Sequence, residues 1–176
     1  MTASDMAQIL EAQFSNALLS KNLDALDPYL VLVPDHWPEV ARWLHDDPRL
    51  HFDILNCISV VDYLETEAAK VAKCGFEPHL EVVYHLSSFT HRHRLTIKLL
   101  LPRWKNDQPG ELPEVPSICS IWSAANWHER EAFDLGGVKF TGHPNLERIL
   151  MAEDWVGHPL RKDYEYPLEY QGIRCR

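Results

Sequence analysis

Two stretches near the middle of the chain alternate apolar and polar side chains. In residues 80–86 (LEVVYHL) and 94–101 (RLTIKLLL), apolar side chains take every second position, and polar ones such as Glu81 and Lys98 fall between them. A period of two is typical of a strand with one buried face. The pattern therefore predicts an antiparallel pair joined by a hairpin loop at residues 87–93.

A period of three to four residues predicts three helices. The first carries its apolar stripe at Leu10, Phe14, Ala17 and Leu18. The second is expected from Pro38 to about His45, since proline is tolerated in a first helical turn. The third is expected to begin at Ser117, a good N-cap residue, and to end at Gly136-Gly137.

Extended segments and a loop separate these helices. Residues 29–33 lie between prolines and are expected to be extended, and residues 52–61 (FDILNCISVV) indicate a buried strand. Residues 102–116 are rich in proline and predict a surface loop. Together these elements predict an α+β fold, in which helices pack on a small mixed or antiparallel sheet.

The last quarter of the chain follows neither period. Large apolar side chains are nevertheless spread through it, at Phe140, Leu146, Ile149, Leu150, Met151, Trp155, Leu160 and Tyr164. This composition argues against disorder, and an irregular segment of this length is uncommon inside a compact domain. We therefore expect an α+β domain at residues 1–137 and an extended docking arm at residues 138–176, which takes its shape along another protein.

Charge and composition argue against several classes of function. The 176 residues include 26 acids and 17 bases, a net charge of −9, so a nucleic-acid partner is not expected. No apolar run approaches the ~20 residues of a membrane-spanning helix, so any membrane contact is expected to pass through a partner. None of the four cysteines lies in a C-x-x-C pair, which argues against a cluster or structural zinc.

The segment WHEREAFDLGG (127–137) holds candidate acid-base chemistry. Glu131 and Asp134 lie three residues apart, and Arg130 precedes Asp134 by four, so a helix would bring them together. We favour an ion-pair cluster over a catalytic acid-base pair. The H-E-x-x-H zinc motif fails, because Ala132 stands where the second histidine is required.

The tripeptide Gly-His-Pro occurs twice, at His143 and His158, with Asp154 and Asp163 close in sequence. These side chains could assemble the metal site of a stand-alone hydrolase. Ligands on an irregular segment lack the rigid support that metal sites need, so docking is favoured. Motifs for nucleotides and the G-x-S-x-G elbow are absent from the sequence.

Residues 126–164 resemble the signature of the C subunit of NADH-quinone oxidoreductase, respiratory complex I. The residues that carry the resemblance are Glu129-Arg130-Glu131, Asp134, Gly137, Phe140, Gly142-His143-Pro144, Leu146, Arg148-Ile149-Leu150, Asp154-Trp155 and Gly157-His158-Pro159-Leu160-Arg161-Lys162-Asp163-Tyr164. Weaker likeness extends upstream over the strand segments. Gly136 departs from the family, which commonly has a bulky apolar residue there.

The resemblance implies a non-catalytic subunit of the peripheral arm, on the cytoplasmic face of the bacterial inner membrane. It implies no cofactor on this chain, while the complex passes electrons from NADH through FMN and iron-sulfur clusters to quinone and translocates protons. The implied partners are the equivalents of the D and B subunits. An equivalent subunit of a ferredoxin-, F420- or hydrogenase-linked membrane complex is the alternative.

The same segment supplies the expected docking residues. Arg130, Arg148, Arg161 and Lys162 are candidates for charge pairs with partners, and Trp155 and Leu160 for buried anchors. The remaining candidates are the acids and histidines of the signature: Glu129, Glu131, Asp134, His143, Asp154, His158 and Asp163.

Overall fold

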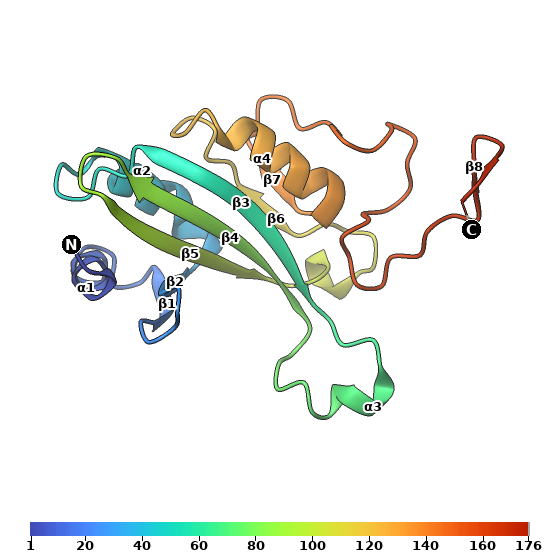
Figure 1. Ribbon diagram of the computed structural model, residues 1–176, viewed down its shortest axis with the longest axis horizontal. Helices are drawn as coiled ribbons and strands as arrows, with labels where there is room; N and C mark the ends of the chain where they lie inside the picture. Colours follow the sequence, from blue (N-terminus) through green and yellow to red (C-terminus); the bar gives the residue numbers. More distant parts are fainter. Residues whose placement is uncertain (176) are drawn as a thin grey trace.

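A five-stranded mixed sheet forms the centre of the protein (Figure 1), whose computed structural model describes residues 1–175. The strand order is β1-β2-β5-β4-β3, with β2 parallel to β5 and the other neighbours antiparallel. The strands are β1 (Leu18–Asn22), β2 (Tyr29–Leu32), β3 (Ile54–Tyr63), β4 (His79–Ser88) and β5 (His93–Leu101). The predicted α+β class is confirmed.

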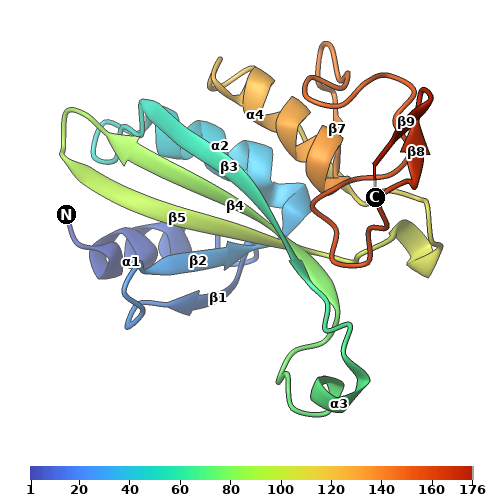
Figure 2. The same ribbon diagram turned by 45° about the vertical axis from the view of Figure 1, so that its right-hand side comes forward.

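Helices cover one face of this sheet through a single apolar core. The helices are α1 (Ala3–Gln13), α2 (Trp37–Asp46) and α4 (Ala125–Glu131), and the short α3 (Ala68–Val71) lies in the β3–β4 connection, away from the sheet (Figures 1 and 2). Two 3-10 turns, η1 (Pro34–His36) and η2 (Lys105–Asp107), complete the connections. Within residues 1–175, no helix has the length and apolar content needed to cross a bilayer.

The antiparallel pair β4–β5 has the predicted faces. Leu80 pairs with Leu101 and Leu86 with Leu95, and these side chains are buried in the core. The hairpin loop is shorter than predicted, because the strands continue to Ser88 and resume at His93. The predicted helix at residues 38–45 and the extended segment 29–33 are confirmed as α2 and β2.

The first helix lies earlier in the chain than its stripe predicts. Thr2 and Asp5 form a reciprocal capping box that begins α1 at Ala3, and the helix ends before Phe14. Ala17 and Leu18 therefore lie outside the helix. Pairing with β2 holds the latter in an edge strand that the pattern does not reveal.

The third helix begins later than predicted and ends where predicted. Ser117 begins only a turn: its hydroxyl oxygen accepts the Cys119 N–H at 3.2 Å, while its O–H donates to the Glu129 carboxylate. The chain then turns until α4 begins at Ala125, and a single π turn, η3 (Ala132–Gly136), extends it. Gly137 ends the helix in the left-handed conformation, with φ 69°.

Gly136, the departure from the family pattern, lies against the sheet. A Cβ added there would come 2.8 Å from the Val60 Cβ on β3. The absence of a side chain therefore lets the end of the π turn approach the strand closely.

The core continues past residue 137. Val138 and Phe140 are buried in it, and β7 (Lys139–Thr141) runs parallel to β6 (Glu114–Pro116), a strand inside the predicted loop. Beyond β7 the chain is irregular until a small terminal hairpin, β8 (Glu169–Tyr170) and β9 (Ile173–Arg174). The division of the chain at residue 137 stays a prediction.

Candidate docking surface and its polar anchors

Asp134 fixes the course of the chain after β7. Its carboxylate, fully buried in the π turn η3, accepts hydrogen bonds from the backbone N–H groups of Ile149, Leu150 and Met151 at 2.7–3.0 Å. It also accepts a hydrogen bond from Nη1 of Arg148 at 2.6 Å. Burial alone would raise the pKa of Asp134, but these donors outweigh it and hold that pKa below its usual value.

Arg161 makes a second anchor near the same helix end. Its guanidinium donates from Nε to the Gly136 carbonyl at 2.8 Å, from Nη2 to Gly137 at 3.0 Å and from Nη1 to Arg103 at 2.9 Å. It lies over the Trp104 ring, 4.5 Å from the centroid. Burial lowers the pKa of Arg161 to about 10, so the side chain remains charged at neutral pH.

A third anchor joins the arm to the distant strand β3. Arg103 bonds the Asp62 carboxylate through Nε and Nη2, and also reaches Asp163 from Nη2 at 2.7 Å. Asp62 in turn accepts the backbone N–H of Lys162 at 2.9 Å. The Arg103 guanidinium, through its hydrogen bond, is the main cause that lowers the pKa of Asp163.

These anchors change the interpretation of residues 142–164, called the anchored arm below. Arg148, Arg161, Asp134 and Asp163 were candidates for pairing with a partner, yet all have partners in their own chain. The anchored arm therefore takes its course from its own domain, which the sequence pattern did not suggest. A contact of these residues with a partner subunit stays a prediction.

The expected pair of Arg130 with Asp134 does not form, because the Asp134 carboxylate turns to the arm. Arg130 instead donates from Nε to the Glu147 carbonyl at 3.2 Å and lies over the Trp127 ring. Glu131 is exposed and lies 4.0 Å from His128.

The outer surface of the arm is rich in exposed apolar side chains. Leu160 is 59% exposed, although its backbone N–H donates to the Leu135 carbonyl at 2.9 Å. The other exposed apolar side chains beyond β7 are Leu150, Val156, Tyr166, Leu168 and Ile173. Trp155 is half-buried, with its indole N–H donating to the Tyr164 hydroxyl and its ring edge-on to Tyr170. The Tyr170 hydroxyl donates to Asp154, while the Lys162 side chain is exposed.

The histidines of the Gly-His-Pro units have separate tasks. His158 packs against Gly137, where an added Cβ would come 2.7 Å from its ring, and its Nδ1 bonds the Asp134 carbonyl. Burial lowers the pKa of His158. In His143, Nδ1 accepts the N–H of Asn145, so Nε2 carries the proton that bonds the Asn126 carbonyl.

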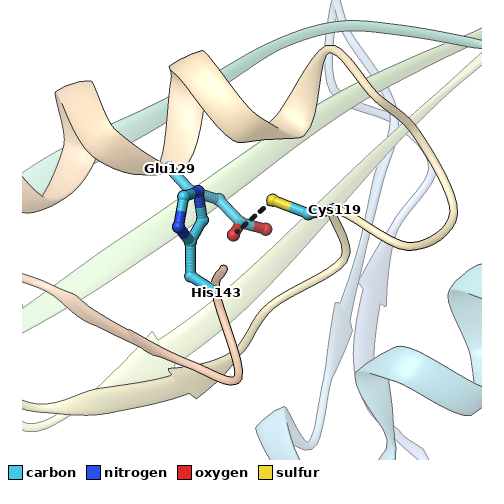
Figure 3. A group of neighbouring side chains, drawn as sticks. All are labelled: Cys119, Glu129 and His143. Atoms are coloured by element: carbon cyan, nitrogen blue, oxygen red, sulfur yellow. Dashed lines mark hydrogen bonds between the residues drawn. The ribbon is translucent and has the colours of Figure 1, made fainter. Parts of the chain in front are cut away.

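Cys119, Glu129 and His143 converge beside α4 and could in principle hold a metal ion (Figure 3), because their donor atoms lie within 4.8 Å of one another. Each donor atom already has a partner. Glu129 accepts the Ser117 hydroxyl, the Ile118 N–H and the Cys119 S–H, and both His143 nitrogens are bonded. Burial raises the pKa of Cys119 to about 11, which keeps it a thiol. Glu129 and Cys119 therefore belong to a closed hydrogen-bond network that ties α4 to the turn at Ser117, while His143 is held separately by Asn126 and Asn145.

Addition of Zn²⁺ tests this interpretation. Metal binding would have to remove the thiol proton of Cys119 and break the existing hydrogen bonds of Glu129 and of His143. We therefore expect a saturating metal excess to leave the Tm unchanged within about 1 °C. A ligand that binds the folded state at 100 times its Kd stabilises it by about 2.7 kcal/mol, which thermal unfolding detects readily. A clear rise in Tm that is lost in Cys119→Ser would contradict the interpretation and favour the hydrolase alternative.

Comparisons with known proteins identify the family of this chain. The family model described as "Respiratory-chain NADH dehydrogenase, 30 Kd subunit" matches residues 30–170. A Roseiflexus protein (strain RS-1), named as the C subunit of NADH-quinone oxidoreductase, is 45% identical over 92% of this chain and 84% of its own length. The Chlorobium phaeobacteroides protein of the same name is 38% identical over 94% of this chain and 90% of its own length.

Two solved structures share the fold. A chain of an archaeal membrane-bound sulfane sulfur reductase superposes with a TM-score of 0.69 at 21% identity, over 92% of this chain and 85% of that one. A trypsin-resistant fragment of Nqo5 gives a TM-score of 0.58 at 26% identity, over 80% of this chain and 98% of the fragment. With the family match across most of the sequence, the chain belongs to the 30 kDa subunit family of respiratory-chain NADH dehydrogenase, that of the C subunit of NADH-quinone oxidoreductase.

Proposed function

We propose that this chain is a non-catalytic docking subunit in the peripheral arm of NADH-quinone oxidoreductase. The observation that carries the proposal is the set of exposed apolar side chains beyond β7, on an irregular segment whose backbone is held over residues 142–164 by buried polar anchors. Exposed apolar side chains concentrated on one segment indicate a protein interface. A backbone fixed in advance lowers the entropy cost of docking.

The complex then supplies the chemistry. In it, electrons pass from NADH through FMN and iron-sulfur clusters to quinone while protons are translocated, and this chain holds none of those groups. Its partners are the equivalents of the D and B subunits, and it reaches the cytoplasmic face of the bacterial inner membrane through them. The closed network at Glu129 supports this division of labour, since its donor atoms are already used.

An equivalent subunit in a ferredoxin-, F420- or hydrogenase-linked membrane complex is the alternative, favoured by the fold shared with the archaeal reductase. The higher identity to NADH-quinone oxidoreductase subunits, 45% against 21%, favours the NADH-linked complex. Neighbouring genes discriminate the two: NADH-binding flavoprotein subunits support the first.

Leu160→Asp tests the docking role. The side chain is exposed, so the isolated chain is expected to keep its Tm, whereas a charge placed in a buried interface is expected to weaken assembly by about 2 kcal/mol or more. The matched control is Leu26→Asp, because Leu26 is 99% exposed in the loop before β2. The measurement is the yield of other subunits that co-purify with the tagged chain after gentle detergent extraction.

We expect the wild-type chain and Leu26→Asp to bring down the equivalents of the D and B subunits, and Leu160→Asp to lose most of them. Equal yields for all three chains would exclude the arm as the docking surface. A wild-type chain that extracts alone would contradict the proposed function itself. Trp155→Ala is less selective, because it also removes the bond to Tyr164.

A further inference from the structure

Trp127 is the exposed tryptophan of this chain. Of the six tryptophans, all within the described residues, it alone is exposed, at 63%, and the other five are buried or half-buried. It lies on α4, on a side of the helix turned away from the core. Tryptophan is enriched at the centres of protein interfaces, where a large rigid ring buries much area at little entropy cost.

Arg130 lies one turn further along α4 and is held in place. Its guanidinium carbon is 5.1 Å from the Trp127 ring centroid, and Nε donates to the Glu147 carbonyl at 3.2 Å. Within residues 1–175, its two terminal nitrogens make no hydrogen bond, and no carboxylate lies within 4 Å of them. Arg103 and Arg148, in contrast, each bond a carboxylate of their own chain.

The unused face of this guanidinium determines what can bind. A planar fork with two free NH₂ groups matches a carboxylate in bidentate geometry, and the contacts with the indole ring and the Glu147 carbonyl hold the fork in place beforehand. A polyanion such as nucleic acid or an anionic bilayer would need several cations, and this chain has a net charge of −9. The chemistry therefore favours a single carboxylate.

We propose that Trp127 and Arg130 form a preassembled binding site for an aspartate or glutamate of a neighbouring subunit, with the indole packing against apolar atoms beside that carboxylate. The proposal rests on the proposed docking function and names a second contact region for it. The Glu147 carbonyl that positions Arg130 belongs to the anchored arm, so this site is continuous with the arm surface. Figure 2 shows α4 and the arm side by side.

The test uses the assembled complex, purified through a tag on this chain at increasing salt concentrations. The variants are Arg130→Gln, Arg130→Lys and Trp127→Ala, and the control is Arg42→Gln, an exposed arginine on α2. We expect Arg130→Gln to weaken retention of the other subunits about 10- to 30-fold, the range for an interface anchor. Arg130→Lys is expected to fall between Arg130→Gln and wild type, because an ammonium keeps the charge but loses the fork.

The salt series tests whether Arg130 forms an ion pair with the neighbouring subunit. Wild-type retention is expected to fall with rising salt, while Arg130→Gln should show a shallower dependence because the ion pair is gone. The Tm of the isolated variants is expected to stay near that of the wild type, which separates docking from folding. Retention of Arg130→Gln and Trp127→Ala equal to Arg42→Gln, in a wild-type complex that assembles normally, would overturn this inference and leave the proposed function standing.

Discussion

Asp134→Ala is expected to lower the free energy of unfolding of the isolated chain by about 3–5 kcal/mol, the cost of breaking a buried ion pair by removing one partner. The loss leaves three consecutive N–H groups, those of Ile149, Leu150 and Met151, without their acceptor. It also leaves the Arg148 guanidinium without its carboxylate partner, although its bonds to two backbone carbonyls remain. Urea unfolding followed by tryptophan fluorescence measures it. A change below about 1 kcal/mol would contradict the role of Asp134 as an anchor.

Two further variants sharpen this result. Asp134→Asn keeps the shape and one acceptor oxygen but loses the charge, so its effect is expected to be smaller than that of alanine. Asp24→Ala is the control, an exposed aspartate in the loop after β1 with no side-chain bond among the described residues. It is expected to change stability by less than about 0.5 kcal/mol.

The Asp134 contribution also depends on pH. Its folded-state pKa is lowered from 3.8, so the folded state favours the carboxylate more than the unfolded state does. The stabilisation is therefore complete above the unfolded pKa and is lost as the pH falls through the lower folded value. The difference in the free energy of unfolding between wild type and Asp134→Asn is expected to shrink below pH 4 and to stay constant from pH 5 to 8.

Arg161→Met is expected to have the second large effect, lowering the free energy of unfolding by about 3 kcal/mol. The substitution keeps much of the apolar stem but leaves the carbonyls of Gly136, Gly137 and Arg103 without their donor. Arg161→Lys is expected to recover little, because an ammonium cannot present the same planar fork to three carbonyls or stack equally on Trp104.

The neighbouring Lys162→Met is the matched control for Arg161→Met. The Lys162 side chain is exposed, and only its backbone N–H takes part in the anchors, so the same substitution there is expected to be nearly neutral. Equal stabilities of Arg161→Met and Lys162→Met in urea would show that the three carbonyl bonds contribute nothing measurable.

Periodic signals in the sequence identified the centre of the fold. The alternation in residues 80–101 gives both strands and their buried faces, because burial on one side of a sheet forces that period. The apolar stripe of α2 works in the same way. Local signals were misleading where tertiary contacts outweigh local preference. Ser117 begins a turn that is held by its bond to Glu129, and the helix starts only at Ala125. The strand β1 forms because it pairs with the edge of β2.

The anchors of the arm could be predicted only in part. Asp134 and Arg161 stand out in the sequence as charges close to glycine or proline, and the resemblance marks both of them and Arg148. Apart from the ion pair between Asp134 and Arg148, their partners are backbone groups, which every residue has, so no sequence pattern reveals these contacts. The contact of Asp62 with the Lys162 N–H joins positions a hundred residues apart and depends on where β3 ends.

Two classes of residue in the arm therefore have separate roles. Buried polar groups set the backbone course, while exposed apolar side chains such as Leu160 remain available to a partner. The sequence pattern indicated this segment and its apolar content. It also led us to expect that a partner protein determines the shape of the segment. The anchors assign the course of residues 142–164 to this chain itself.

Amide hydrogen exchange on the isolated chain tests this central claim most directly. We predict that the amides of Ile149, Leu150, Met151 and Lys162 exchange slowly without any partner, and that Asp134→Ala removes the protection at the first three. Exchange at these four amides at the rate of an unfolded chain, with protection appearing only in the assembled complex, would contradict it.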